Sequence, residues 1–215
     1  MYSAAAKELA SYLLKGDIYG SWAIIQEYDY KDYQSCYIFE HLLSESMHYI
    51  GELWQKDLVT VADEHLATGI CDYILTKYSF EKGQQAAQGR KALLFCPEGE
   101  QHYLGLKMTA SIFKENGWEV KNLGASLPLE YALNTAEKWK PDVIGISLSL
   151  THHLPLLKKY IEELEQLSFH PKILVGSRLI NRYDFTPFCS KETVLIKKLE
   201  DLEPWILSQS KEIAI

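Results

Sequence analysis

The feature that most constrains the fold of this chain is a change in the spacing of its apolar residues. From Ala4 to about Phe80 they recur at helical spacing and proline is absent, which is unusual for strands and turns. Beyond Arg90, short apolar runs alternate with helical stretches. The segment between them loses the apolar period and carries two glycines. We therefore predict two domains joined by a linker, at residues 1–80, 91–215 and 81–90 respectively.

The first domain is predicted to be a four-helix bundle. Gly16 can take the left-handed backbone conformation that ends its first helix. Thr60, followed three positions later by Asp63, is an acidic variant of the capping box and marks the start of its fourth helix. The predicted helices run from about Ser3 to Leu14, Ile18 to Glu27, Tyr30 to Gln55 and Thr60 to Tyr78.

The second domain repeats strand and helix about five times. This pattern predicts a flavodoxin-like (Rossmann-like) α/β fold, with a five-stranded parallel sheet and helices on both faces. Strands are predicted at residues 92–96, 119–123, 143–148, 172–175 and 194–196, and helices at 105–116, 128–138, 154–167, near Leu179 and at the C-terminal end. Ligands bind such sheets at the carboxyl ends of the strands, beside the point where strand order reverses. The loops that follow Cys96, Leu148 and Val175 are therefore the predicted site.

Composition disfavours several classes of protein. No apolar run reaches 18 residues, and Lys7 and Glu8 lie inside the first apolar pattern, so neither a membrane anchor nor a signal peptide is predicted. The four cysteines are scattered without a C-x-x-C pair, which argues against a zinc site or a disulfide framework and favours the cytoplasm. A formal charge of −7 disfavours direct binding to nucleic acid.

The loop after the first predicted strand carries the motif Glu100-x-His102-x-x-Gly105. An imidazole there can ligate a metal through one ring nitrogen while the other bonds a carboxylate, for which Glu100 is well placed. Gly105 has no β-carbon, so a backbone or a ligand can pass close to it. Taken alone the motif is a weak signal, because a histidine and a glycine at a strand-to-helix turn more often have structural roles.

Three further segments follow this motif in order, and together the four resemble the cobalamin-binding domain family. They are Asn122-Leu123-Gly124, Pro141–Ser147 and Val175-Gly176. The resemblance covers about Ala92 to Arg178. It implies that cobalamin binds base-off, with His102 in place of the cofactor's own dimethylbenzimidazole as the lower ligand of cobalt.

The resemblance also assigns roles to the neighbours of His102. It implies that Glu100 is the hydrogen-bond partner of His102, that Gly105 leaves room for the nucleotide tail, and that Ser147 contacts this tail. The family usually has aspartate where this chain has Glu100, and paired glycines where it has Gly176-Ser177. Ser177 therefore adds a hydroxymethyl group on the expected path of the tail. Further candidates in the next loop are Ser149, Thr151 and the His152-His153 pair, although exposed loop histidines usually have no such role.

The helical domain carries a second signature, Trp54 followed after nine residues by Glu64-His65. A bundle that covers a corrin needs a large flat surface and a few polar groups, and these residues supply both. A helix-end core aromatic and a solvated polar pair are the alternative interpretation. The spacing resembles that of the light-responsive MerR-type repressors, which implies that Trp54 lies over the adenosyl group of adenosylcobalamin, beside Glu64 and His65.

This second resemblance runs from about Ala5 to the end of the chain, which leaves no residues for the DNA-binding domain of those repressors. We therefore expect a cobalamin sensor that signals to a partner protein, such as a transcription regulator, and that forms a homo-oligomer. The residue after Trp54 is Gln55, where the best-understood members have a histidine that captures cobalt after illumination. A stable bis-histidine photoproduct is not expected, unless His65 or another histidine substitutes.

Two other functions stay open. A corrinoid methyl carrier of a methyltransferase system would combine a similar bundle and domain with methylcobalamin, but it needs an upper face that is open to partners. A phosphate- or nucleotide-binding flavodoxin-like protein is less favoured, since Glu98 and Glu100 would repel a phosphate at the first loop. Whether the chain is a sensor or a methyl carrier, we do not expect it to be a complete enzyme.

Overall fold

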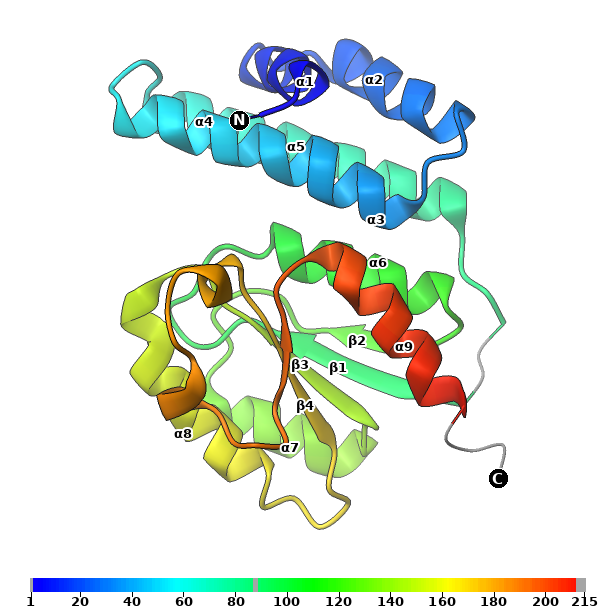
Figure 1. The fold of residues 1–215 in the computed structure, drawn as a ribbon, viewed down its shortest axis with the longest axis vertical. Helices are drawn as coiled ribbons and strands as arrows, with labels where there is room; N and C mark the ends of the chain where they lie inside the picture. Colours follow the sequence, from blue (N-terminus) through cyan, green and yellow to red (C-terminus); the bar gives the residue numbers. More distant parts are fainter. Residues whose placement is uncertain (1, 87–88, 212–215) are drawn as a thin grey trace. The chain divides into compact units, whose positions relative to one another are not determined.

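The computed structural model describes residues 2–86 and 89–211, and the chain divides into two compact units, Met1–Gly83 and Gln84–Ile215. The first unit is built of helices and the second is an α/β unit with a parallel sheet (Figure 1). The predicted fold class is therefore confirmed. No helix within the described ranges combines the length and the apolarity that crossing a membrane requires.

The helices of the first unit differ from the prediction mainly at one boundary. The long helix predicted from Tyr30 begins instead at Ser35, because Asp32 takes a positive φ of 63° and ends the preceding helix. The elements are α1 (Ala4–Leu14), α2 (Ile18–Tyr30), α3 (Ser35–Tyr37), the π-helical segment η1 (Ile38–Ser44), α4 (Glu45–Gln55) and α5 (Val61–Lys82). From α3 to α4 the helical segments follow one another without a break.

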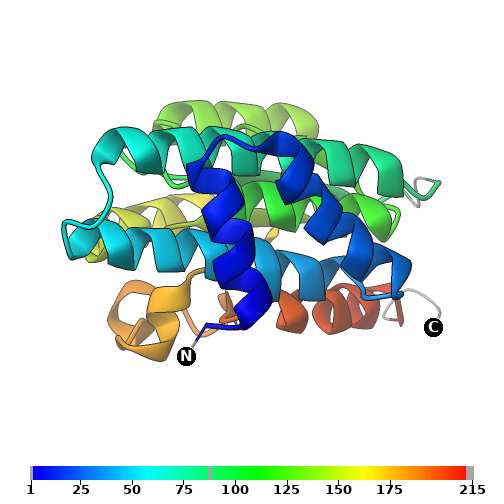
Figure 2. The ribbon, with the colours of Figure 1, turned by 90° about the horizontal axis from the view of Figure 1, so that it is seen from above.

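Helix α1 crosses over α4 and α5, which run side by side (Figure 2). Its buried face consists of Ala6, Leu9, Ala10 and Leu13. Ser46 of α4 is fully buried, and its hydroxyl lies 2.8 Å from the carbonyl oxygen of Ala6 and 2.6 Å from that of Leu42. Buried polar groups need such partners, so Ser46 ties α1 to α4 in a defined position.

The capping box predicted at the start of α5 is present. Thr60 Oγ1 accepts a hydrogen bond from the Asp63 N–H at 3.2 Å, and Asp63 Oδ2 accepts one from the Thr60 N–H at 2.8 Å. Helix α5 ends at Lys82, followed by Gly83 with a φ of 77°, so it extends two residues into the segment predicted as a linker. Glu64 and His65 thus lie in the capped first turns of this helix.

The sheet of the second unit has the strand order β2-β1-β3-β4-β5, and every pairing is parallel. Its strands are β1 (Lys91–Phe95), β2 (Glu119–Asn122), β3 (Val143–Ser147), β4 (Lys172–Gly176) and β5 (Val194–Ile196). The central strands β1, β3 and β4 are almost continuously apolar and buried, as parallel strands covered on both faces must be.

Helices cover both faces of this sheet, with α6 and α9 on one face and α7 and α8 on the other (Figure 1). Their bounds are Leu104–Glu115 for α6, Leu129–Trp139 for α7, Leu154–Leu164 for α8 and Leu202–Lys211 for α9. Short 3-10 turns lie at Thr151–His153 (η2), Arg178–Asn181 (η3), Thr186–Phe188 (η4) and Leu199–Asp201 (η5). Strand order reverses at β1, which pairs with β2 on one side and β3 on the other, so the loops after β1 and β3 are neighbours.

We expect Thr60→Ala to lower the free energy of unfolding by about 1 kcal/mol, because it removes the hydroxyl that caps α5. Urea unfolding followed by the helical circular dichroism signal measures the change. Thr60→Ser keeps the hydroxyl and should remain close to the unmodified protein. Equal stability of the alanine variant and the unmodified protein would contradict the role of this capping box.

Candidate functional site

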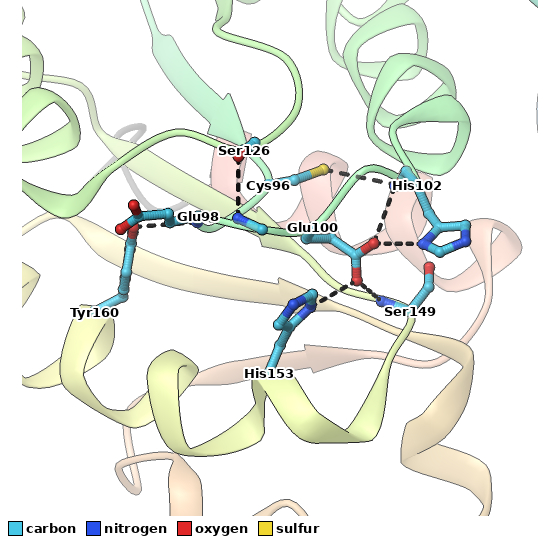
Figure 3. Close-up of polar contacts among 9 residues, drawn as sticks. Cys96, Glu98, Glu100, His102, Ser126, Ser149, His153 and Tyr160 are labelled. Atoms are coloured by element: carbon cyan, nitrogen blue, oxygen red, sulfur yellow. Dashed lines mark hydrogen bonds and ion pairs between the residues drawn. The ribbon is translucent and has the colours of Figure 1, made fainter.

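The centre of the site is Glu100, whose carboxylate is fully buried in the loop between β1 and α6 (Figure 3). Oε1 accepts hydrogen bonds from the backbone N–H of His102 at 2.9 Å and from its Nδ1 at 2.5 Å. Oε2 accepts from the backbone N–H of Ser149 at 2.7 Å and lies 3.3 Å from Nδ1 of His153. One carboxylate therefore joins the loop after β1 to the loop after β3.

These hydrogen bonds determine the charge of Glu100. Burial by itself raises the pKa of a carboxyl group, but the donors from His102 and Ser149 and the charge of His102 outweigh it and lower the pKa of Glu100 to about 2. Glu100 is therefore ionised at neutral pH. Within the part of the chain that the structure describes, no buried side-chain nitrogen or oxygen lacks a hydrogen-bond partner.

His102 combines this buried partner with access from outside, since its side chain is 55% exposed. A carboxylate can only accept a hydrogen bond, so Nδ1 of His102 carries a proton, and in the neutral form of the ring Nε2 then carries the lone pair. A carboxylate on Nδ1 fixes the tautomer and raises the basicity of the imidazole, which suits Nε2 for ligating a metal. Among the described residues, no three His, Cys, Asp or Glu side chains gather into a metal site of their own.

The loop that carries His102 is held in place from two further sides (Figure 3). The Gly99 N–H donates to Ser126 Oγ at 3.0 Å, and the Ser126 N–H donates to the Glu100 carbonyl at the same distance. The Glu98 N–H donates to the Tyr160 hydroxyl at 3.2 Å. Gly99 has a φ of 83°, a conformation that favours glycine. The site is therefore preorganised by contacts from several elements.

Cys96, at the end of β1, was not identified from the sequence as part of the site. Its thiol lies 3.7 Å from the carbonyl oxygen of His102 and is hydrogen-bonded to Ser147. Burial, together with the nearby charge of Glu100, raises the pKa of Cys96 to about 12. Cys96 therefore remains a neutral thiol that packs under the loop, and it is unsuited to nucleophilic chemistry.

Two glycines of the predicted site border open space. A β-carbon added at Gly105, in the first turn of α6, or at Gly176, at the end of β4, would meet no atom within 4 Å. Ser147 pairs with Gly176 across the ends of β3 and β4. The open space at these two positions leaves room for a bound group to lie close to the backbone.

Ser177, which the resemblance would put on the path of the nucleotide tail, directly follows β4 in the structure. Its side chain is buried, and its Oγ accepts a hydrogen bond from the Leu179 N–H at 3.2 Å, which caps η3. Its hydroxyl is therefore occupied within its own turn. Ser149 contributes its backbone N–H to Glu100.

The His152-His153 pair also corrects an expectation. The sequence led us to treat both as exposed loop histidines, but only His152 is exposed, and His153 is buried against Glu100. The burial of His153 follows from the turn η2, which carries it back under the sheet edge into contact with the loop after β1. No local pattern distinguishes the two residues, so the sequence could not separate them.

The remaining predicted residues belong to the helical unit. Trp54, at the end of α4, is 47% exposed, an unusual exposure for so large an apolar ring. Glu64 Oε2 lies 3.1 Å from Nδ1 of His65, and Glu64 Oε1 accepts from the Thr68 hydroxyl at 3.0 Å. Exposed apolar side chains also occur near this end of α4 and α5, at Leu58, Val61 and Leu66. The unit thus presents an aromatic ring and a polar pair at one end.

Comparison with known proteins gives two family matches. One family model, described as a B12 binding domain, matches residues 90–181, and a second with the same description matches residues 5–77. The first contains β1 to η3 and all the polar contacts of Glu100. The second lies within the helical unit. Together the two matches cover well over half of the chain.

Several curated proteins are similar in sequence. The HTH-type transcriptional repressor CarA of Myxococcus xanthus is 34% identical over 87 residues, which are 40% of this chain and 30% of that protein. A corrinoid protein of Desulfitobacterium hafniense (strain Y51) is 30% identical over 129 residues, 59% of this chain and 58% of that protein. Methionine synthase of Mycobacterium leprae is 29% identical over 129 residues, only 10% of that protein. The chain spans less than two thirds of each relative.

Solved structures support the same fold. The monomethylamine corrinoid protein of Methanosarcina barkeri is 17% identical, with a TM-score of 0.71 over 95% of this chain and 98% of that one. The methanol:cobalamin methyltransferase complex MtaBC of the same organism gives a TM-score of 0.52 at 14% identity, over 100% of this chain and 82% of that one. Both units of the chain therefore match models described as B12 binding domains, the α/β unit at residues 90–181 and the helical unit at residues 5–77.

Proposed function

We propose that this protein binds cobalamin base-off through His102 and acts as a light-responsive sensor that uses adenosylcobalamin. The observation that carries the binding mode is the buried, ionised carboxylate of Glu100 on Nδ1 of the half-exposed His102. A lone imidazole suits a metal whose other ligands come from a macrocycle. Bound cobalamin would supply a cobalt centre whose upper ligand light can remove.

In this proposal, Glu100 keeps the Nε2 lone pair of His102 directed at the cobalt position. Gly105 and Gly176, where the backbone borders open space, would leave room for the nucleotide tail. Ser147, at the end of β3, pairs with Gly176, and Ser177 follows Gly176 with a hydroxyl oxygen that accepts a hydrogen bond within its own turn. These residues bind and orient the cofactor.

The helical unit is proposed to provide the upper side of the site. Trp54 offers a flat apolar surface for an adenosyl group, and Glu64 with His65 offers polar partners for the ribose and adenine. The half-exposed ring of Trp54 leaves apolar surface that a packing partner could cover. Glu64 is held in place by Thr68, so the pair is oriented beforehand.

A sensor of this kind works if its helical unit has two arrangements that bind the cofactor with different affinity. Removal of the upper ligand would then shift the population between them, and a change in packing or oligomeric state would reach a partner protein. The similarity to the repressor CarA supports a transcription regulator as this partner. We do not expect the chain itself to bind nucleic acid, because its formal net charge is −7.

A corrinoid methyl carrier is the second candidate function, and the similarity to a corrinoid protein of D. hafniense favours it. Such a carrier would use methylcobalamin and present cobalt to a methyltransferase. Binding in darkness separates the two functions, since the sensor should prefer adenosylcobalamin and the carrier methylcobalamin. Tighter binding of methylcobalamin would overturn the sensor proposal while leaving the role of His102 intact.

The lower ligand is tested by His102→Ala. We expect this variant to lose most of its affinity for cobalamin, or to show an absorption spectrum with another lower ligand, because Nε2 is lost. His152→Ala, which removes an exposed imidazole from the neighbouring loop, is the matched control. An unchanged spectrum and affinity for His102→Ala would exclude His102 as the ligand.

The aromatic upper surface is tested by Trp54→Ala. We expect adenosylcobalamin to lose roughly a few kcal/mol of binding free energy, the range for truncating a packed aromatic. Methylcobalamin and hydroxocobalamin lack the bulky upper group and should be much less affected. Isothermal titration with the three cofactors measures these differences. Equal weakening for all three would assign Trp54 to the stability of the bundle, and no weakening would place the upper surface elsewhere.

Illumination tests the role of Gln55, which replaces the histidine found in the best-understood light-responsive repressors. Because glutamine is a poor cobalt ligand, we expect green light to leave no stable spectrum with histidine on both sides of cobalt and to cause slow loss of cofactor. Absorption spectra and gel filtration before and after light record both effects. A sharp, stable bis-histidine spectrum would contradict this prediction and would indicate that another histidine, such as His65, reaches cobalt.

A further inference from the structure

His153 is a buried histidine that the binding mode described above does not use. Only 7% of the residue is exposed, and its Nδ1 lies 3.3 Å from Oε2 of Glu100. Since the carboxylate can only accept, Nδ1 of His153 is the donor. Two imidazoles therefore share one carboxylate, His102 on Oε1 and His153 on Oε2 (Figure 3).

The other edge of the His153 ring is also enclosed by the loop that carries His102. A β-carbon added at Gly99 would lie 3.2 Å from Nε2 of His153, so the ring sits directly against the Gly99 backbone. His152 packs edge-on against the ring, with 4.1 Å between ring centroids. His153 thus fills the space between η2 and the loop after β1, and its donor atom points at Glu100.

The orientation of Glu100 matters because both of its oxygens are in use. Rotation of the carboxylate would take Oε1 away from Nδ1 of His102 and release the imidazole. Two donors on Oε2, the Ser149 N–H and His153 Nδ1, oppose this rotation. The contact with His153 is the longest of the four hydrogen bonds to Glu100. Of the two donors that the segment after β3 supplies, however, His153 is the one that donates from its side chain.

We propose that His153 is a positioning residue for the lower cobalt ligand, acting through Glu100 to hold His102 in its ligating orientation and tautomer. The expected effect of His153 on cobalamin binding rests on the proposed function. Its effect on His102 exists in the cofactor-free protein as well. Ligand histidines commonly depend on such outer partners, whose loss weakens metal binding roughly 10- to 100-fold.

The test compares His153→Asn with His153→Leu. The asparagine amide nitrogen is as many bonds from the backbone as Nδ1 and can still donate to Glu100, whereas leucine is of similar size and has no donor. We expect His153→Asn to remain close to the unmodified protein. His153→Leu should bind cobalamin roughly 10- to 100-fold more weakly and show less of the histidine-ligated spectrum. His152→Ala controls for the ring contact, and thermal unfolding confirms that each variant is folded.

A second measurement uses the protein without cobalamin. Nitrogen-15 NMR of the imidazoles should show His102 protonated at Nδ1 in the unmodified protein and in His153→Asn, and a mixture of tautomers in His153→Leu. If His153→Leu retains the unmodified tautomer, spectrum and affinity, the proposal is wrong. If His153→Asn is as impaired as His153→Leu, the ring acts by packing alone, which also overturns it. If His153→Leu changes the tautomer of His102 but the unmodified protein does not bind cobalamin, the proposed function is refuted and the positioning role of His153 is not.

Discussion

A carboxylate can be buried without losing its charge only if hydrogen-bond donors replace the water around it, and the site is organised around this requirement at Glu100. Its four donors come from residues in two different loops. With its pKa lowered to about 2, Glu100 stays ionised and keeps the proton of His102 on Nδ1. The orientation, the tautomer and the basicity of the proposed cobalt ligand all depend on this one buried charge.

The sheet topology brings these donors together. Strands β1 and β3 are hydrogen-bonded neighbours although about fifty residues separate them, so the loops at their carboxyl ends meet. The same arrangement places Ser147 beside Gly176, next to backbone that is open at Gly105 and Gly176. A parallel sheet with a reversal of strand order therefore brings together the residues of the proposed cobalamin site at the carboxyl ends of its strands.

The features of the helical unit on which the sensor proposal rests are the half-exposed ring of Trp54 and the hydrogen-bonded pair of Glu64 and His65. These features lie on helix ends whose geometry the capping box at Thr60 stabilises. The matches of both units to B12 binding domain models fit both functions. The identity of the upper ligand would therefore decide between them, and in our proposal the helical unit contacts this ligand.

The sequence alone determined the two-part organisation, the parallel α/β class, the capping box and the pairing of Glu100 with His102, because each follows from local periodicity or from residues two or three positions apart. Tertiary structure decided the rest. The start of the long helix at Ser35 depends on the left-handed backbone at Asp32. No glycine or proline at this position indicates such a conformation in the sequence. The burial of His153, the turn that occupies the Ser177 hydroxyl and the thiol of Cys96 under the loop depend on contacts between segments far apart in the chain or on the path of a turn. Local spacing carries no information on such contacts, since the folded sheet is what brings these atoms within hydrogen-bonding distance.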